Sequence, residues 1–328
     1  MLISIILPVF NEEENLPLVY QTLNDITEKL NKDFNYEIIF VNDGSKDNSW
    51  PIICKLAEHD ERVIGINFSR NFGHQMALTA GYDHAKGDII ISMDADLQDP
   101  PSLIIDMVHK WQQGADIVYA RRIDRNDGFL KKMTAQFYYK FLDKISDVSI
   151  PRHVGDFRLI DRKVLNFLQN CRERSRYLRG MVAWGGFKQD YIDFKRPNRH
   201  AGQTGYTWSK MIKLAFDGMT GFSLFPLRVA AFTGIFVIGT SLAMFLFILL
   251  DTIIYSVQYP LFKWLAVIMY GFTGIQFLLM WILGEYIGRI FEQQKGRPLY
   301  ITSEIKTKKY PQPSTERDQS KKSRELTL

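Results

Sequence analysis

The chain has 328 residues, 46% of them hydrophobic, and a formal net charge of +5. That length suffices for one large domain or two smaller units, and the hydrophobic share is ordinary for a globular protein. The two cysteines, Cys54 and Cys171, lie far apart in sequence, which excludes the spacings of a metal site or a redox pair. We expect both to be reduced packing residues of a cytosolic domain.

The first half of the chain alternates between strand-like and helix-like stretches. Residues 2–9 are apolar but lack the basic start and the cleavage site of a signal peptide, so we expect a buried strand there. Strands are expected at residues 3–9, 36–41, 63–68, 88–93 and 116–120, and helices at residues 16–30, 50–58, 75–84 and 102–113. This alternation predicts an α/β fold with a mainly parallel sheet covered on both faces.

Polar residues follow several of the predicted strands. They are Asn11-Glu12, Asp43, Ser69-Arg70-Asn71, and Asp94 with Asp96. In parallel sheets of this kind, ligands bind outside the carboxyl ends of the strands. We therefore expect the functional site at this edge of the sheet.

Asp94 and Asp96 carry the clearest chemical signal. They end an apolar strand and are separated by one residue, so both carboxylates can point at one site. Mg²⁺ and Mn²⁺ prefer oxygen ligands, commonly one or two carboxylates plus substrate phosphates, and Gln98 could add a neutral oxygen. Such a metal would neutralise a diphosphate leaving group. The alternative, a capped helix start at Asp99, accounts for neither Asp94 nor Asp96.

Residues at the ends of the first two strands could bind a nucleotide base. Asp43 could accept a hydrogen bond from a pyrimidine N–H, although Asn-Asp-Gly-Ser is also a favourable turn and both can hold for the same loop. Pro8 and Glu12 could cradle the base.

Further along, Asp156 follows Gly155, which permits a close backbone approach. Asp156 could act as a general base or orient the acceptor, or it could simply be the ion-pair partner of Arg158. Single arginines in loops are often just solvated, but three basic residues are candidate phosphate clamps. They are Arg121, Lys132 and Arg199. His74 and His200 lack metal-ligand spacing and are interpreted as ordinary polar residues.

Two long uncharged segments, residues 229–250 and 264–284, are each long enough to cross a bilayer as a helix. Basic residues flank their outer ends, so the positive-inside rule places both ends, and the domain before them, in the cytoplasm. The hairpin contains no charged pathway, which argues against a transporter.

Segments on either side of this hairpin also suggest membrane contact. Residues 131–145 and 206–216 have the pattern of interfacial amphipathic helices, although ordinary surface helices fit equally well. Basic residues after the last apolar segment favour an anionic membrane surface over nucleic acid. The alternative for residues beyond 310 is a solvated, disordered end. We expect a catalytic domain at 1–205, an interfacial segment at 206–228, the hairpin at 229–288 and a basic tail at 289–328.

Four motifs together resemble those of the family 2 glycosyltransferases. They are Pro8-Val9-Phe10-Asn11-Glu12, Val41-Asn42-Asp43-Gly44-Ser45, Asp94-Ala95-Asp96-Leu97-Gln98 and Gly155-Asp156-Phe157-Arg158. The resemblance runs from about residue 2 to residue 301 and narrows to the polyprenyl-phosphate sugar transferases. The stretch at 284–290 is similar to the bacterial bactoprenol glucosyltransferase branch.

The resemblance implies a GT-A (Rossmann-like) fold and inverting transfer of a sugar from a UDP- or GDP-sugar, with UDP-glucose favoured, to undecaprenyl or another polyprenyl phosphate. It implies Mg²⁺ or Mn²⁺ at Asp94, Asp96 and Gln98. Nucleotide contacts are implied at Pro8, Glu12 and Asp43, and acceptor-phosphate contacts near Arg121 and Arg199. By family analogy a flippase is a candidate partner, and a membrane hairpin of this kind favours a homo-oligomer in the inner (plasma) membrane.

Two positions depart from the family pattern. Many relatives have a Ser-Lys pair where this chain has Thr204-Gly205, which leaves Arg199 with more of the phosphate contact. Phe10 stands where relatives often have tyrosine, which keeps stacking but removes a hydroxyl. Two other functions are alternatives: transfer to a hydroxyl of a lipid-linked or cell-wall glycan, and a non-catalytic membrane scaffold. The intact Asp43, Asp94, Asp96 and Asp156 argue against the scaffold.

Overall fold

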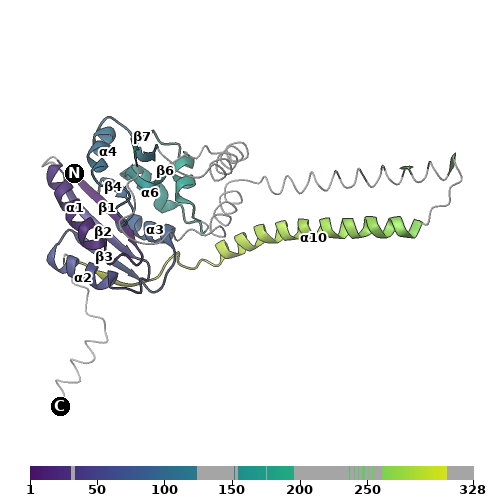
Figure 1. Cartoon of the computed structure of the whole chain (residues 1–328), viewed down its shortest axis with the longest axis horizontal. Coiled ribbons are helices and arrows are strands. Elements are labelled where there is room, and N and C mark those ends of the chain that lie inside the picture. Colours follow the sequence, from purple (N-terminus) through teal and green to yellow (C-terminus); the bar gives the residue numbers. More distant parts are fainter. Residues whose placement is uncertain are drawn as a thin grey trace, which may run out of the picture.

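The computed structural model describes residues 1–30, 34–123, 151, 154–174, 176–195 and 261–308, with isolated helical positions between 236 and 254. In the first 123 residues, strands and helices alternate in the predicted order (Figure 1). They are β1 (Leu2–Val9), α1 (Leu16–Lys29), β2 (Asn35–Asn42), α2 (Ser49–His59), β3 (Val63–Phe68), α3 (His74–His84), β4 (Ile89–Ser92), α4 (Leu103–Gln112) and β5 (Ile117–Arg122). Each agrees with its predicted range to within two residues.

The second part of the domain adds elements that the sequence did not predict. They are β6 (Val154–Asp161), α6 (Arg162–Asn170), α7 (Leu178–Trp184), β7 (Gln189–Phe194) and β8 (Thr302–Lys306). The eight strands in the described part of the chain form one sheet in the order β7-β5-β6-β4-β1-β2-β3-β8. Strands β6 and β8 run against the others. The predicted α/β class with a mainly parallel sheet is therefore confirmed.

The sheet is buried on both faces because apolar side chains alternate between two cores. In β1, Ile3, Ile5 and Leu7 pack on one face and Ile6 on the other, and all four are fully buried. Helices α1, α2 and α4 cover the first face, and α3, α6 and α7 cover the second. This burial stabilises the sheet. Because β1 pairs parallel with both β2 and β4, the carboxyl ends of the three strands lie at the same edge.

A helix of 34 residues, α10 (Leu261–Gln294), extends away from the sheet domain (Figure 1). It includes the predicted span at 264–284. Within the described part of the chain, no helix meets the length and hydropathy expected of a membrane crossing. The predicted span at 229–250 lies largely outside the described residues. The predicted amphipathic segments at 131–145 and 206–216 lie entirely outside them.

Part of the segment expected to be a basic tail is an ordered strand. After α10 the chain returns to the domain, and β8 pairs antiparallel with β3 at the sheet edge. Tyr300 stacks on Phe68 with ring centroids 5.1 Å apart, and Lys306 Nζ lies 2.9 Å from Glu58 Oε1. Residues 309–328 lie outside the described range.

Candidate functional site

The antiparallel strand β6 brings Asp156 beside the end of β4. Ser92, the last residue of β4, is in register with Arg158, so two residues further along the ladder Asp94 meets Asp156. Ser92 Oγ donates to the Asp156 carbonyl oxygen at 2.6 Å, which fixes the β6 backbone there. Residues 62 positions apart in sequence thus meet at the predicted edge.

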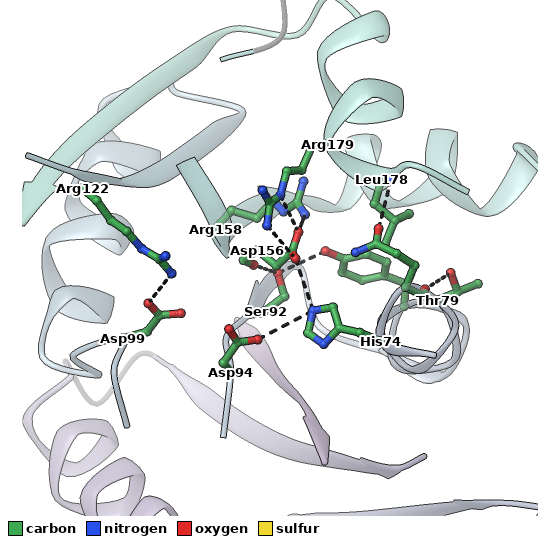
Figure 2. Close-up of polar contacts among 12 residues, drawn as sticks. His74, Thr79, Ser92, Asp94, Asp99, Arg122, Asp156, Arg158, Leu178 and Arg179 are labelled. Atoms are coloured by element: carbon green, nitrogen blue, oxygen red, sulfur yellow. Dashed lines mark hydrogen bonds and ion pairs between the residues drawn. The ribbon is translucent and has the colours of Figure 1, made fainter. Parts of the chain in front are cut away.

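Asp156 is the buried centre of a polar cluster whose other members, apart from Arg158, are partly exposed (Figure 2). Arg158 Nη2 donates to its Oδ1 at 2.6 Å, and the Arg158 side chain is fully buried. Arg179, from α7, donates from Nε to Oδ1 at 3.2 Å and from Nη2 to Oδ2 at 3.1 Å. His74 Nε2 lies 3.2 Å from Oδ2. The expected Arg158–Asp156 partnership is present, but as one contact among several.

These contacts keep Asp156 ionised. Burial by itself raises the pKa of Asp156, but the charge of Arg179, the hydrogen bond with His74 and the charge of Arg158 together lower that pKa well below its ordinary value. A general base works best when its pKa lies near the operating pH. Asp156 is therefore poorly suited to remove a proton, and well suited to hold positive groups in place.

His74 is a site residue that the sequence interpretation missed. It begins α3, directly after the polar residues that end β3, and its Nε2 lies 3.7 Å from Asp94 Oδ1 as well as near Asp156. Burial lowers its pKa, but the hydrogen bond to Asp156 and the charges of Asp94 and Asp156 outweigh this and raise the pKa to about 9. The available signal was its position next to the Ser69-Arg70-Asn71 cluster, at the carboxyl end of a strand.

Asp43 holds the loop that carries His74. Its Oδ1 accepts from the Phe72 amide at 2.6 Å, and its Oδ2 accepts from the Gly73 amide at 2.9 Å. Gly73 has φ +100°, a conformation that favours glycine. Burial raises the pKa of Asp43, although these amide hydrogen bonds lower it. The Asp43 carboxylate thus holds the loop after β3 rather than its own predicted turn, and its contact with a nucleotide base stays a prediction.

The other residues predicted to contact the nucleotide lie at the same edge. Pro8 is buried in β1 opposite Val41, and Phe10, just past the strand, is 46% exposed. Glu12 accepts from Asn15 Nδ2 at 2.6 Å, and its amide donates to Ser49 Oγ at 3.0 Å. The Asn11 amide donates to Ser45 Oγ at 2.9 Å, which joins the loops after β1 and β2, and Phe10 is exposed beside them.

The predicted metal ligands occupy one turn after β4. Asp94 is partly exposed, whereas Asp96 and Gln98 are buried, and the Gln98 amide donates to Asp96 Oδ1 at 3.1 Å. Burial raises the pKa of Asp94; His74 opposes this rise, and the charges of Asp156 and Asp96 add to it. A cation would relieve that repulsion.

Within the described ranges, no three or more His, Cys, Asp or Glu side chains are grouped to hold a metal ion. Two carboxylates nevertheless suit Mg²⁺ or Mn²⁺, because such ions commonly take one or two carboxylates and complete their shell with substrate phosphates and water. The donor set therefore fits an ion bound together with a diphosphate.

Arg121, predicted as an acceptor-phosphate clamp, points elsewhere. It forms two hydrogen bonds with Asp193, from Nε at 2.5 Å and from Nη2 at 2.9 Å, and both side chains are exposed. Successive side chains of a strand point to opposite faces, so its neighbour Arg122 projects to the other side of β5. Arg122 Nη2 lies 3.3 Å from Asp99 Oδ1, in the turn after β4 (Figure 2). The structure thus places Arg122 near the cluster.

Two more predicted clamps, Lys132 and Arg199, lie outside the described residues. Arg179, in contrast, is a member of the cluster that sequence reasoning missed. It lies in α7, remote in sequence from every motif, and nothing in the local pattern distinguishes it from other surface arginines.

Residues 4–168 match the protein family described as Glycosyl transferase family 2. An uncharacterized glycosyltransferase of Bacillus subtilis strain 168 is 45% identical over 301 residues, covering 91% of this chain and 92% of the relative. The bactoprenol glucosyl transferase of Shigella phage SfV is 42% identical over 309 residues, covering 94% of this chain and all of the relative.

Among solved structures, mannosyl-3-phosphoglycerate synthase from Rubrobacter xylanophilus is similar with a TM-score of 0.45 and 14% identity, covering 66% of this chain and 71% of that one. This likeness is weak beside the sequence relatives, which span nearly the whole chain.

Proposed function

Because this chain belongs to glycosyl transferase family 2 and is a glycosyltransferase enzyme, we propose that it transfers a sugar from a nucleotide-sugar to a polyprenyl phosphate, with inversion at the anomeric carbon. UDP-glucose is the favoured donor. Support for the acceptor comes from relatives named bactoprenol glucosyl transferase, at 42% identity over most of the chain.

The observation that carries the proposal is the meeting of Asp94, through His74, with an Asp156 that is held ionised by Arg158 and Arg179. Asp96 lies in the same turn as Asp94, two residues further along. A negatively charged turn at the end of a parallel strand suits a metal-bound diphosphate. The positive groups around Asp156, namely Arg158, Arg179 and His74, suit a second anionic reactant brought next to it.

In the proposed reaction, an oxygen of the acceptor phosphate attacks the anomeric carbon from the side opposite the nucleoside diphosphate. The new bond joins that oxygen to the anomeric carbon, and the bond to the diphosphate breaks with its electron pair leaving on the diphosphate. A phosphate monoester has its second pKa near 6 and is already mostly ionised at pH 7. No residue has to remove a proton, and Asp156 serves by orienting Arg179 and His74.

The alternative acceptor, a sugar hydroxyl, would need a general base. Asp156 is the candidate for that task, but its pKa lies well below the ordinary value. This direction of shift favours the phosphate acceptor.

A bound Mg²⁺ or Mn²⁺ would supply neutralisation of the leaving diphosphate. Asp94 and Asp96 are the residues proposed to hold it, with Gln98 beside them. Pro8, Phe10, Glu12 and Asp43 are proposed to receive the nucleoside, because they gather at the ends of β1 and β2. Arg199 and Lys132 stay proposals for phosphate contact.

We propose that residues 229–288 anchor the enzyme in the inner (plasma) membrane as a two-helix hairpin, with the catalytic domain on the cytoplasmic side. The supporting features are the uncharged runs and the length of α10, about 50 Å for 34 helical residues. Large apolar side chains of α10 also face outward: Leu265, Met269, Met280, Trp281, Leu283, Ile287, Ile290 and Phe291. A surface of that kind is unfavourable in water.

The test is transfer of labelled sugar from a panel of UDP- and GDP-sugars to undecaprenyl phosphate in detergent, with Mg²⁺ or Mn²⁺ and with EDTA. Lipid-soluble label from one donor, lost with EDTA and in Asp96→Ala, is the expected result. Nucleotide binding without any transfer would contradict the acceptor, and transfer that persists in EDTA would contradict the metal.

A further inference from the structure

A cavity of about 520 Å³ lies where the carboxyl end of α10 meets the sheet domain. It is distinct from the Asp94–Asp156 cluster. Its polar lining combines three arginines with a single carboxylate, an amide and a phenol. These side chains are Asp83, Arg172, Arg174, Gln293, Arg297 and Tyr300.

The cavity is built by a clamp between α10 and the segment after α6. Gln293 Oε1 accepts from the Arg174 amide at 2.9 Å, and Gln293 Nε2 donates to the Arg172 carbonyl at 3.1 Å. Arg174 Nη1 also donates to the Glu292 carbonyl at 3.0 Å. Backbone and side-chain contacts on both sides therefore hold the arginine-bearing segment against the helix end.

The carboxylate in the lining is already matched. Asp83 Oδ2 accepts from Arg172 Nη1 at 2.9 Å and from the Tyr300 hydroxyl at 3.0 Å. Arg174 Nη1 lies 3.6 Å from Oε2 of the half-exposed Glu292, and Arg297 adds a further positive charge to the lining. A guanidinium has five N–H donors in a planar fork that matches phosphate oxygens. The balance of charge in the cavity therefore favours an anion.

The position of the cavity separates it from the reaction centre. His74 begins α3 and Asp83 lies near its end, nine residues later, which corresponds to about 14 Å along the helix. On α10, the outward-facing apolar side chains continue to Phe291, two residues before Gln293. The cavity thus begins where the apolar surface of α10 ends.

We propose that this cavity is a second anion site that binds a phosphate group, either the headgroup phosphate of an anionic phospholipid or a free phosphate. Binding of a lipid headgroup rests on the membrane placement of α10 proposed above, whereas binding of a phosphate group as such does not. A bound headgroup would join α10 to the 172–174 segment and to Tyr300, and so fix the domain against the membrane surface.

The test uses the full chain in non-ionic detergent, titrated calorimetrically with short-chain phosphatidylglycerol, short-chain phosphatidylcholine and inorganic phosphate. We expect an Arg174→Gln/Arg297→Gln variant to lose about fivefold in affinity per arginine removed, so roughly 25-fold. Arg174→Lys/Arg297→Lys should retain most of the affinity. The matched control is Lys29→Gln/Lys55→Gln, which removes two exposed positive charges from α1 and α2 and should bind as the wild type does.

If only phosphatidylglycerol binds in a way that depends on the two arginines, the ligand is a lipid headgroup. If the binding of inorganic phosphate depends on them equally, the ligand is free phosphate. The proposal is overturned if the double variant binds phosphatidylglycerol and inorganic phosphate as tightly as the wild type does. It is also overturned if the wild type binds neither. Arg297→Gln alone serves as the second variant if the double variant unfolds, because Arg297 takes no part in the clamp defined above. Sugar transfer is measured separately, so that failure of the proposed reaction and failure of the anion site are distinguishable.

Discussion

His74 Nε2 lies between two carboxylates, 3.2 Å from Asp156 Oδ2 and 3.7 Å from Asp94 Oδ1. The start of α3 is thereby tied to the ends of β4 and β6. Asp43 supports the same arrangement from β2, since it accepts hydrogen bonds from the Phe72 and Gly73 amides just before His74.

The pKa of about 9 predicts how His74 affects stability. A histidine whose pKa is raised on folding stabilises fully below its unfolded value of about 6.5, and that contribution is lost as the pH rises through 9. In metal-free buffer, the melting temperature of the wild type should exceed that of His74→Gln at pH 6, and the two should converge by pH 10. A constant difference across this range would contradict the assignment.

Replacing Asp156 by asparagine leaves the buried Arg158 without its charge partner. Breaking a buried ion pair in this way costs about 3–5 kcal/mol, and we expect a fall in melting temperature on the order of 10 °C. Scanning calorimetry measures this directly. Asp193→Asn, which removes an exposed partner of Arg121, should leave the melting temperature almost unchanged. An Asp156→Asn enzyme with near-normal turnover on lipid phosphate would count against an essential role for Asp156.

Adjacent arginines provide a matched comparison of the acceptor contact. Arg122 lies beside the turn after β4, whereas Arg121 is engaged by Asp193. We propose that Arg122 contacts the acceptor phosphate, because it is the arginine of this pair that lies beside the turn after β4. Arg122→Gln should then raise the KM for polyprenyl phosphate about tenfold or more, because a charge-assisted contact to the acceptor is lost. Arg121→Gln should change that KM little. The reverse order in steady-state assays would restore the sequence-based choice of Arg121.

Removing the metal or its carboxylates should abolish donor binding. With Mn²⁺ present, calorimetric titration of UDP into the wild type should give a saturable signal that EDTA eliminates, and Asp96→Ala should lower kcat/KM by at least about 100-fold. Asp106→Ala, on the exposed face of α4, is the control and should behave as the wild type. UDP binding that is indifferent to EDTA would contradict a metal at Asp94 and Asp96.

The elements from β1 to β5, and the sheet edge at which Asp43, Asp94 and Asp96 lie, could be predicted from the amino-acid sequence. This information is local, because apolar periodicity sets each strand and helix and parallel connections bring the carboxyl ends to one side. The four motifs also sufficed to indicate the family.

Arg158 was a candidate partner of Asp156 from the sequence, but the places of Arg179 and His74 beside Asp156 follow from the tertiary structure alone. Strand β6 inserts antiparallel between β4 and β5, and that pairing, between residues far apart in the chain, places Asp156 opposite Asp94. The same long-range packing brings Arg179 and His74 to it and turns Arg122 rather than Arg121 toward the turn after β4. Such contacts cannot be predicted from the local sequence pattern. They depend on how strands that are far apart in sequence pair with one another, and on the register of that pairing.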